Sequence, residues 1–182
     1  MEWNEYKTKI KKALDIFNFD KEILKILKNS IKKNQKIFVA GNGGSAATAN
    51  HYACDLSKGA NKNWEKEKDR FKVISLSSPI EYITAISNDL DYSEIFKQQL
   101  INLASPKDIC VLISASGNSP NIIKAARCAK DLEMIVIGIT GFEGGKLKEL
   151  ADYSAHIPVK EYEICEDIHS IFGHFLTSYL RE

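Results

Sequence analysis

From Lys36 onward, this 182-residue chain alternates short apolar runs rich in β-branched residues with longer segments of helical periodicity. The apolar runs predict strands near residues 36–41, 72–76, 109–114, 135–140 and 154–159. The segments between and after them predict helices near residues 44–57, 80–87, 92–104, 120–131, 144–151 and 163–181. Parallel strands need a long crossover between them, usually a helix, so this alternation predicts an α/β fold. We expect a five-stranded parallel sheet flanked by helices on both faces, the three-layer arrangement of flavodoxin-like and Rossmann-like proteins.

The segment before this repeat has a helical pattern of its own. Its apolar residues recur at helical spacing in two stretches, and Asp20 between them is expected to cap the second helix. We therefore predict a single domain over residues 1–182, in which a helical hairpin at 1–33 precedes an α/β core at 34–182. One small sheet offers little room for the apolar stripes of the hairpin, so we expect a contact between subunits, with packing inside the monomer as the alternative.

The charges of the chain nearly cancel, with 25 Lys plus Arg against 24 Asp plus Glu. No general positive field favours nucleic acid or an anionic membrane surface as a partner, so binding is expected to be local. No apolar stretch has the length of a membrane span and the first residues do not resemble a secretory signal, so a cytoplasmic location is expected. Cys54, Cys110, Cys128 and Cys165 are scattered without a C-x-x-C pair, which predicts reduced thiols. The lysine-rich segment 58–70 is expected to be an exposed loop.

A polar loop follows the apolar run at 109–113. It reads Ser-Ala-Ser-Gly-Asn-Ser at 114–119, and a helix is expected to start at Pro120. Helix N-termini carry unpaired N–H donors and the positive end of the dipole, Gly117 lets the backbone approach an anion, and the serines add hydroxyl donors. The loop therefore predicts a phosphate-binding site, although an ordinary turn rich in capping residues has the same composition.

A second loop of this kind follows the apolar run at 37–40. It reads Gly-Asn-Gly-Gly-Ser at 41–45, and three glycines in five residues indicate unusual backbone angles or a closely approaching ligand. It is neither a P-loop, since no Gly-Lys-Ser/Thr follows, nor a dinucleotide fingerprint, since the third glycine is misplaced, so no nucleotide is expected. Ligands of open parallel sheets bind beyond the carboxyl ends of the strands. Both loops would lie there, so we expect them to share one pocket for a phosphorylated small molecule.

Histidines and carboxylates gather on the first and the last helix of the predicted α/β core. His51 and Asp55 are four residues apart and share one helix face. The terminal helix carries Glu166 and His174, which lie within roughly 80° of each other and two turns apart. Such groups could hold a divalent metal or transfer protons, whereas taken singly each is more often an ordinary polar residue.

Together these motifs resemble the sugar isomerase (SIS) family and, within it, the phosphoheptose isomerases. The resemblance spans nearly the whole chain, and its specific parts are the glycine loop followed by His51, an Asn-Asp pair at 88–89, the serine loop, and a terminal helix with Glu166, His169 and His174. It implies an SIS-type fold and an enzyme that converts sedoheptulose 7-phosphate into D-glycero-D-manno-heptose 7-phosphate through an enediol. It also suggests that the heptose is made for a cell-surface polysaccharide such as lipopolysaccharide or capsule.

The resemblance further implies a set of site residues. Those expected to bind the substrate are Asn42, Gly43, Gly44, Ser45, Asn88, Asp89, Ser114, Ser116, Asn118 and Ser119. A zinc ion would be held by His51, Asp55, Glu166 and His174, in a homotetramer whose active sites lie between subunits. Proton transfer is assigned to His174 together with Asp55 or Glu166.

Two of these positions depart from the family, which usually has Glu where this chain has Asp55 and Gln where it has Glu166. Asp55 has about 1.5 Å less reach on ordinary bond lengths. Two carboxylates would also make a zinc site formally neutral, so that it polarises a carbonyl less strongly, although Glu166 could itself serve as a base. The departures keep open a non-catalytic SIS module that senses a sugar phosphate or binds a protein partner, and an isomerase for another heptose or a hexose phosphate.

Overall fold

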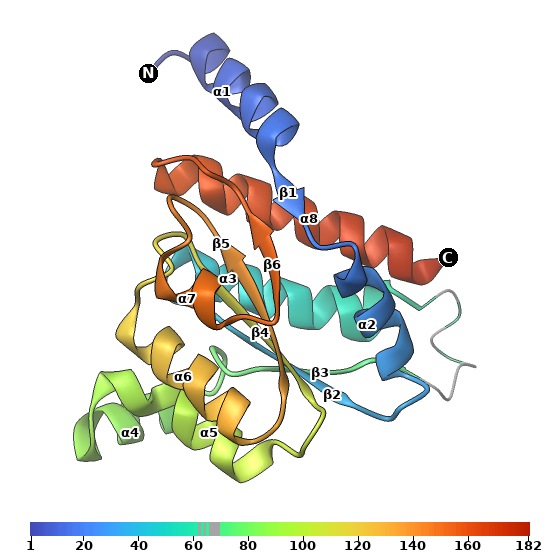
Figure 1. Ribbon diagram of the computed structural model, residues 1–182, viewed down its shortest axis with the longest axis vertical. Helices are drawn as coiled ribbons and strands as arrows, with labels where there is room; N and C mark the ends of the chain where they lie inside the picture. The colour runs from blue at the N-terminus through green and yellow to red at the C-terminus, as the bar shows by residue number, and fades with distance from the viewer. Residues whose placement is uncertain (62, 64, 66–69) are drawn as a thin grey trace.

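The computed structural model (Figure 1) describes residues 1–61, 63, 65 and 70–182 of the chain. Six residues of the loop expected at 58–70, namely 62, 64 and 66–69, therefore lie outside the described residues. The beginning of that segment belongs instead to a π-helical turn, η1 (Asp55–Gly59), which continues the preceding helix α3 (Gly44–Cys54). Among the helices of the described residues, none is both long enough and apolar enough to cross a bilayer.

Within the described residues, six strands form one sheet, in the order β1-β6-β5-β4-β2-β3. The five that pair in parallel are β2 (Lys36–Ala40), β3 (Lys72–Ser75), β4 (Ile109–Ser114), β5 (Ile135–Thr140) and β6 (Tyr153–His156). β4 and β5 have the predicted bounds, and β6 is shorter than predicted because Pro158 has no N–H to continue the ladder. The predicted parallel sheet is therefore present.

A sixth strand, β1 (Asn18–Phe19), extends this sheet beyond the five that the sequence predicts. It pairs antiparallel with β6 and lies between the two predicted N-terminal helices, α1 (Trp3–Ile16) and α2 (Glu22–Ser30). The segment is thus helix, strand and helix rather than a plain hairpin, because Phe19 packs on Phe172 of the last helix. The prediction that Asp20 caps α2 is wrong. Its side-chain Oδ2 instead accepts a hydrogen bond from the backbone N–H of Ser154 in β6, at 2.7 Å.

Helices cover both faces of the sheet (Figure 1). On one face lie α2, α3 and α8 (Tyr162–Arg181), with α1 packed on α8. On the other lie the helices that follow β3, β4 and β5, which are α4 (Ile80–Asp89), η2 (Tyr92–Glu94), α5 (Ile95–Leu103), α6 (Pro120–Asp131) and α7 (Gly145–Leu150). Alternate residues of β2 enter the two cores, Ile37 and Val39 on the α3 side and Phe38 and Ala40 on the α5 side. Burial on both faces explains why the strands read as continuous apolar runs.

The strand order reverses direction at one point in this sheet. From β2 the chain passes outward to β3 and then returns to the other side of β2 to form β4. Such a switch point leaves a crevice at the carboxyl ends of the two central strands, because the connections on either side turn away from each other. The glycine loop follows β2 and the serine loop follows β4, so the topology brings them together.

Candidate active site

The glycine loop between β2 and α3 takes a shape that other residues would not allow. Gly43 has a φ of 54° and a ψ of −123°, a combination open to glycine. A Cβ on Gly41 would lie 2.3 Å from the carbonyl oxygen of Ser45, and a Cβ on Gly44 would lie 2.2 Å from Oε2 of Glu166. The glycines therefore close the turn tightly and let a carboxylate of α8 approach the N-terminal end of α3.

The serine loop wraps its own hydroxyls around the start of α6. Ser114 Oγ accepts a hydrogen bond from the backbone N–H of Gly117 at 3.2 Å and lies 3.5 Å from Ser119 Oγ. Ser119 is the N-cap residue of α6, and its side chain makes no capping hydrogen bond. Gly117 has a φ of 65° and lies so near Gly144 that a Cβ would overlap its carbonyl oxygen. The hydroxyls and the helix N-terminus are thus arranged as an anion site requires.

The two loops open into one cavity of about 120 Å³, as expected. Asn42 and Ser45 of the glycine loop line it together with Ser114, Ala115, Ser116 and Ser119 of the serine loop, Ile113 of β4, and Tyr162 and Glu166 of α8. Burial raises the pKa of Glu166, with smaller contributions from the neighbouring carboxylates Glu163 and Asp167. A carboxyl of raised pKa among neutral hydroxyls is suited to proton transfer.

A hydrogen-bonded network that the sequence analysis did not identify holds Asn42 in place. Asn42 Nδ2 donates to Asn121 Oδ1 at 2.9 Å, and Asn121 Nδ2 donates back to Asn42 Oδ1 at 2.8 Å. Tyr92 adds a hydroxyl donor to the same Asn42 oxygen at 2.9 Å. Asn121 is 1% exposed, so its amide is committed to this pairing. The sequence offered no signal for this role, because an asparagine in the first turn of a helix looks like any other polar residue.

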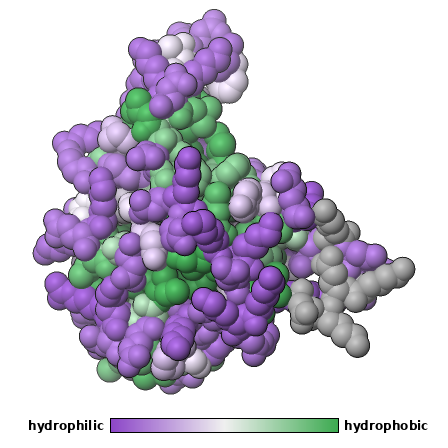
Figure 2. All heavy atoms as spheres, turned by 45° about the vertical axis from the view of Figure 1, so that its right-hand side comes forward, coloured by the Kyte–Doolittle hydropathy of each residue, from purple (hydrophilic) through white to green (hydrophobic). Residues whose placement is uncertain are grey.

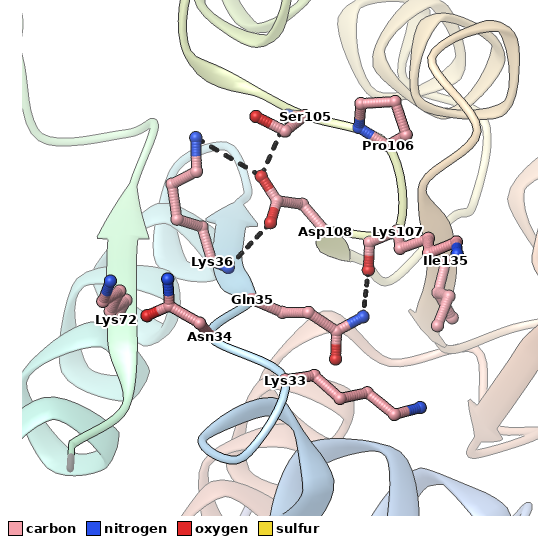
Figure 3. A pocket seen from close by; sticks show the side chains of 10 residues that line it. All are labelled: Lys33, Asn34, Gln35, Lys36, Lys72, Ser105, Pro106, Lys107, Asp108 and Ile135. Atoms are coloured by element: carbon pink, nitrogen blue, oxygen red, sulfur yellow. Dashed lines mark hydrogen bonds and ion pairs between the residues drawn. The ribbon is translucent and has the colours of Figure 1, made fainter.

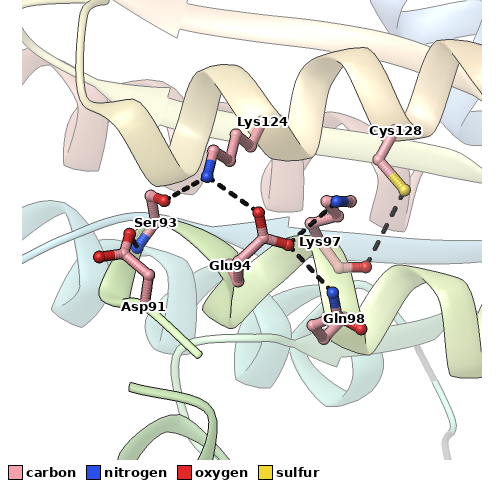
Figure 4. Close-up of polar contacts among 7 residues, drawn as sticks. All are labelled: Asp91, Ser93, Glu94, Lys97, Gln98, Lys124 and Cys128. Carbon is pink, nitrogen blue, oxygen red and sulfur yellow. Dashed lines mark hydrogen bonds and ion pairs between the residues drawn. The ribbon is translucent and has the colours of Figure 1, made fainter. Parts of the chain in front are cut away.

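The segment that carries Tyr92 is itself fastened to α6 (Figure 4). The Glu94 carboxylate accepts hydrogen bonds from Lys124 Nζ at 2.9 Å and from Gln98 Nε2 at 3.0 Å, and Lys97 pairs with it at 3.0 Å. Lys124 also donates to Ser93 Oγ at 2.6 Å. These partners, Lys124 first, lower the pKa of Glu94 to about 2. η2 is therefore tied to the helix that starts at the serine loop.

Three of the four predicted metal ligands form a second cluster. His51 Nε2 lies 3.1 Å from Asp55 Oδ2 and 3.1 Å from His174 Nε2, and the third pair, His174 Nε2 and Asp55 Oδ2, is 3.9 Å apart. The side chains of His51 and His174 are 57% and 62% exposed. They line a hollow of about 320 Å³ with Ala47, Thr48, Tyr52 and Ser170. Asp55 is the first residue of the π-helical turn, a geometry that is frequent at functional sites.

The donor set of this cluster fits a metal ion. Ligand atoms on a tetrahedral zinc, at about 2.0–2.2 Å from the ion, lie roughly 3.3–3.5 Å from one another, and the three distances here bracket that range. The fourth predicted ligand, Glu166, is two helical turns from His174 along α8 and lines the serine cavity instead. Within one chain, the structure thus brings together His51, Asp55 and His174 and keeps Glu166 with the serine loop.

Five predicted substrate contacts do not line the shared cavity of a single chain, and they are Gly43, Gly44, Asn88, Asp89 and Asn118. Gly43 lines a neighbouring hollow, and Gly44 lies beside Glu166. Asn88 and Asp89 are exposed at the end of α4, where Asn88 Nδ2 donates to Asp89 Oδ1 at 2.9 Å. Asn118 bonds the carbonyl of Ser116 at 3.1 Å and accepts from the N–H of Lys146 at 3.1 Å. Its side chain therefore fastens the serine loop to α7.

Comparison with known proteins places these features in a family context. Residues 8–141 match the model of the SIS domain family. The phosphoheptose isomerase of Helicobacter hepaticus is 36% identical over 95% of this chain and 88% of its own length. Phosphoheptose isomerase 1 of Campylobacter jejuni is 33% identical over 100% of this chain and 95% of its own. Among solved structures, the phosphoheptose isomerase of Neisseria gonorrhoeae superposes with a TM-score of 0.85, at 26% identity over 98% of this chain and 94% of that one.

Proposed function

The chain belongs to the SIS domain family and, within it, to the phosphoheptose isomerases, and from this membership we propose that its shared loop cavity isomerises sedoheptulose 7-phosphate to D-glycero-D-manno-heptose 7-phosphate. It is an enzyme, an aldose-ketose isomerase. The observation that carries the proposal is the meeting of two anion-binding loops in one cavity beside Glu166. A non-catalytic sensor is not favoured, because relatives that match nearly end to end are named as enzymes.

The phosphate of the substrate would bind at the serine loop. Ser116 and Ser119 present hydroxyls to the cavity, and the N-terminus of α6, a helix of 12 residues, adds backbone N–H donors and a positive dipole end. Because the phosphate is remote from the reacting carbons, its binding energy would orient the sugar without taking part in the chemistry. The serines would therefore bind the substrate, and other residues would transfer the proton.

Proton transfer between C1 and C2 requires a base and an acid near the enediol. Glu166 lines the cavity, and its raised pKa reflects a carboxylate that is partly withheld from water. His174 belongs to the metal-ligand cluster and is exposed. We assign one proton transfer to Glu166 and the opposite one to His174, acting through Nδ1 because its Nε2 would be the zinc ligand, with the glycine loop holding the sugar between them in the assembled site.

We propose that His51, Asp55 and His174 hold a zinc ion. Three protein ligands with one open position is the pattern of catalytic zinc sites. When bound, zinc would supply a Lewis acid that polarises the carbonyl oxygen of the sugar. Asp55 Oδ2 lies 3.1 Å from His51 Nε2, which supports Asp55 as a ligand of the same ion despite its shorter side chain.

We further propose a homotetramer in which the sites lie between subunits. The helix α1 projects from the body of the molecule, and apolar surface gathers at its base (Figures 1 and 2). Large apolar side chains are exposed on α1 and on α8, namely Trp3, Leu14, Ile16, Ile171 and Phe175. A partner chain packed there would cover this surface and lie beside His174 on the same helix.

We also infer a cytoplasmic location and a role in supplying heptose for cell-surface polysaccharide, as the family resemblance suggests. Cys54, Cys110, Cys128 and Cys165 are free thiols, which suits a reducing compartment. The net charge of +1 gives no basis for a nucleic-acid or membrane partner.

The test is to incubate the purified protein with sedoheptulose 7-phosphate in deuterated water, with and without a chelator. We expect the aldose product to carry deuterium at C2, because the enediol exchanges its proton with solvent, and we expect the chelator to lower the rate. Turnover without deuterium would exclude the enediol route. Turnover that persists at full rate after complete metal removal would exclude the zinc proposal while leaving the isomerase intact.

A further inference from the structure

A larger cavity lies at the opposite end of the sheet, where the parallel strands begin. It has a volume of about 740 Å³, within the range of small-molecule sites. The residues that line it come from the starts of β2, β3, β4 and β5 and the turns before them, and they are Lys33, Asn34, Gln35, Lys36, Lys72, Ser105, Pro106, Lys107, Asp108 and Ile135 (Figure 3). No sequence motif marks this end of the molecule, and the proposed isomerisation does not use it.

The charge of this cavity is strongly unbalanced. Four lysines line it against a single carboxylate, Asp108, whereas the whole chain has a net charge of only +1. Asp108 is 4% exposed, and its oxygens are committed to the backbone N–H groups of Lys36 at 2.8 Å and Ser105 at 3.0 Å. Lys36 Nζ also pairs with Asp108 at 3.4 Å. These two residues neutralise each other, so the other three lysines set the charge of the cavity.

Within the described part of the chain, no ion pair forms to Lys33, Lys72 or Lys107. They come from three separate segments around the hollow (Figure 3). Three unpaired positive charges around one concave surface raise the local concentration of anions, more so for an anion that can meet all three at once.

The turns that carry two of these lysines are fixed by local structure. Lys107 has a φ of 73°, and Asn34, next to Lys33, has a φ of 57°, both in the left-handed region. Gln35 is only 9% exposed, and its side-chain Nε2 donates a hydrogen bond to the carbonyl of Lys107. This bond links the two turns. A backbone that is fixed before binding lowers the ordering cost of forming a site.

We propose that this cavity is a second ligand site, which binds an oligophosphate chain. A single phosphate carries a charge of about −1.5 to −2, less than the three ammonium groups present, whereas a chain of two or three phosphates carries enough charge to match them. The ligand could be inorganic oligophosphate or the phosphate chain of a nucleotide, since both present the same chemistry to lysine. The site is remote from the serine cavity, so its occupation does not depend on the isomerase activity.

The test is calorimetric titration of the full-length protein with inorganic triphosphate, ATP and adenosine at fixed low salt. We expect triphosphate and ATP to bind and adenosine not to bind. The variant Lys33→Gln/Lys72→Gln/Lys107→Gln should weaken triphosphate binding by at least tenfold, with unchanged thermal unfolding and isomerase activity, because the three side chains are exposed. The matched control is Lys11→Gln/Lys12→Gln/Lys21→Gln, which removes the same charge from exposed positions elsewhere and should bind as the wild type does.

The outcomes separate this site from the alternatives. Equal weakening by both triple variants would mean general electrostatic attraction and would overturn the proposal. Displacement of triphosphate by sedoheptulose 7-phosphate would place it in the serine cavity and would also overturn it. Equal affinity for triphosphate and ATP would assign recognition to the phosphate chain alone, while tighter binding of ATP would add a contact to the nucleoside, and either supports the site.

Discussion

At the scale of single residues, Glu166 is a carboxylate lining the cavity at a position where the family resemblance implies glutamine. Glu166→Gln keeps the size of the side chain and removes its ability to accept a proton. If Glu166 transfers a proton, kcat should fall by about a hundredfold with little change in KM, although the variant restores the usual family residue. Steady-state kinetics measure this, and Glu149→Gln, which changes an exposed carboxylate of α7 outside the cavity, should leave kcat unchanged. A wild-type kcat for Glu166→Gln would leave proton transfer to His174 and Asp55.

Asn121 is expected to act through Asn42 rather than on the substrate. Asn121→Ala removes both hydrogen bonds of the reciprocal amide pair and frees the glycine-loop side chain, so KM should rise about tenfold while kcat changes less. Tyr92→Phe removes a single bond to the same Asn42 oxygen and should have a smaller effect. A purely structural role would lower the stability of Asn121→Ala without this bias toward KM. Kinetics and thermal unfolding of the two variants distinguish the cases.

His169 is expected to make the folded protein sensitive to acid. Burial, with a smaller contribution from His156, lowers the pKa of His169 to about 4 against the opposing effect of the Thr140 backbone. Between pH 6.5 and 4 the unfolded chain therefore binds a proton that the folded chain does not, so stability falls as the pH falls, by about 3 kcal/mol in all. His169→Phe should flatten this slope, while His174→Gln at an exposed position should keep it. Urea unfolding at pH 7, 5.5 and 4 measures the slopes, and an unchanged slope in His169→Phe would contradict the assignment.

The candidate site shows what a sequence can and cannot reveal about single residues. Ser114, Ser116 and Ser119 could be predicted because they follow a strand and precede a helix, a local signal. The pairing of Asn42 with Asn121 joins positions 79 residues apart, and no local pattern carries it. Glu166 and His174 lie two turns apart on α8, and which hollow each of them lines depends on how that helix packs on the rest of the chain.

At the scale of elements, the predicted bounds are correct where the sequence of a segment marks its two ends. β4, β5 and α6 have the predicted bounds, because both strands are buried on both faces and Pro120 marks the first turn of the helix. The strand β1 was missed because two residues are too short for any periodicity and pair only once β6 is in place. The last residues of the helix predicted at 44–57 were expected to be α-helical, whereas from Asp55 onward the chain forms the π-helical turn η1.

The packing of α3 on α8 sets the distance between the histidines of the metal-ligand cluster. Gly173 of α8 lies against the buried ring of Tyr52, and a Cβ there would be 2.0 Å from Cε1 of that ring. The ring cannot swing away, because Tyr52 donates from its hydroxyl to the carbonyl of His169 at 2.6 Å. Glycine is therefore required at position 173 because the two helices touch there, and not because the backbone adopts a conformation that favours glycine.

Gly173→Ala should destabilise the protein by about 1–3 kcal/mol, although alanine is the better helix former. In the background Tyr52→Leu, which removes the ring, the same change should become neutral or stabilising. Denaturant unfolding of the four proteins in this cycle measures the coupling. Stabilisation by Gly173→Ala in the wild-type background would show that α3 and α8 are not packed as described.

At the scale of the whole molecule, the topology accounts for where the two cavities lie. The switch between β2 and β4 places the serine and glycine loops at the carboxyl edge of the sheet, as the sequence order of strands and helices predicts. The lysine-lined cavity forms at the amino edge, from turns that have no sequence motif. The number of subunits depends on surfaces that pack against other copies, so the residue pattern of one chain does not predict the proposed tetramer.

The final prediction concerns the proposed composite site. The serine cavity and the cluster around His174 line different hollows of one chain, so a site between subunits would take them from two copies. Ser116→Ala/Ser119→Ala should weaken substrate binding roughly a hundredfold, at about 1.4 kcal/mol for each lost hydrogen bond, and His174→Ala should lower kcat.

In a 1:1 mixture of these two variants reassembled from unfolded chains, half of the serine loops and half of the histidines are intact. About a quarter of composite sites are then fully intact, and activity should return. Light scattering would establish the oligomer, each variant reassembled alone serves as the control, and a mixture no more active than the two variants apart would place both groups in one chain.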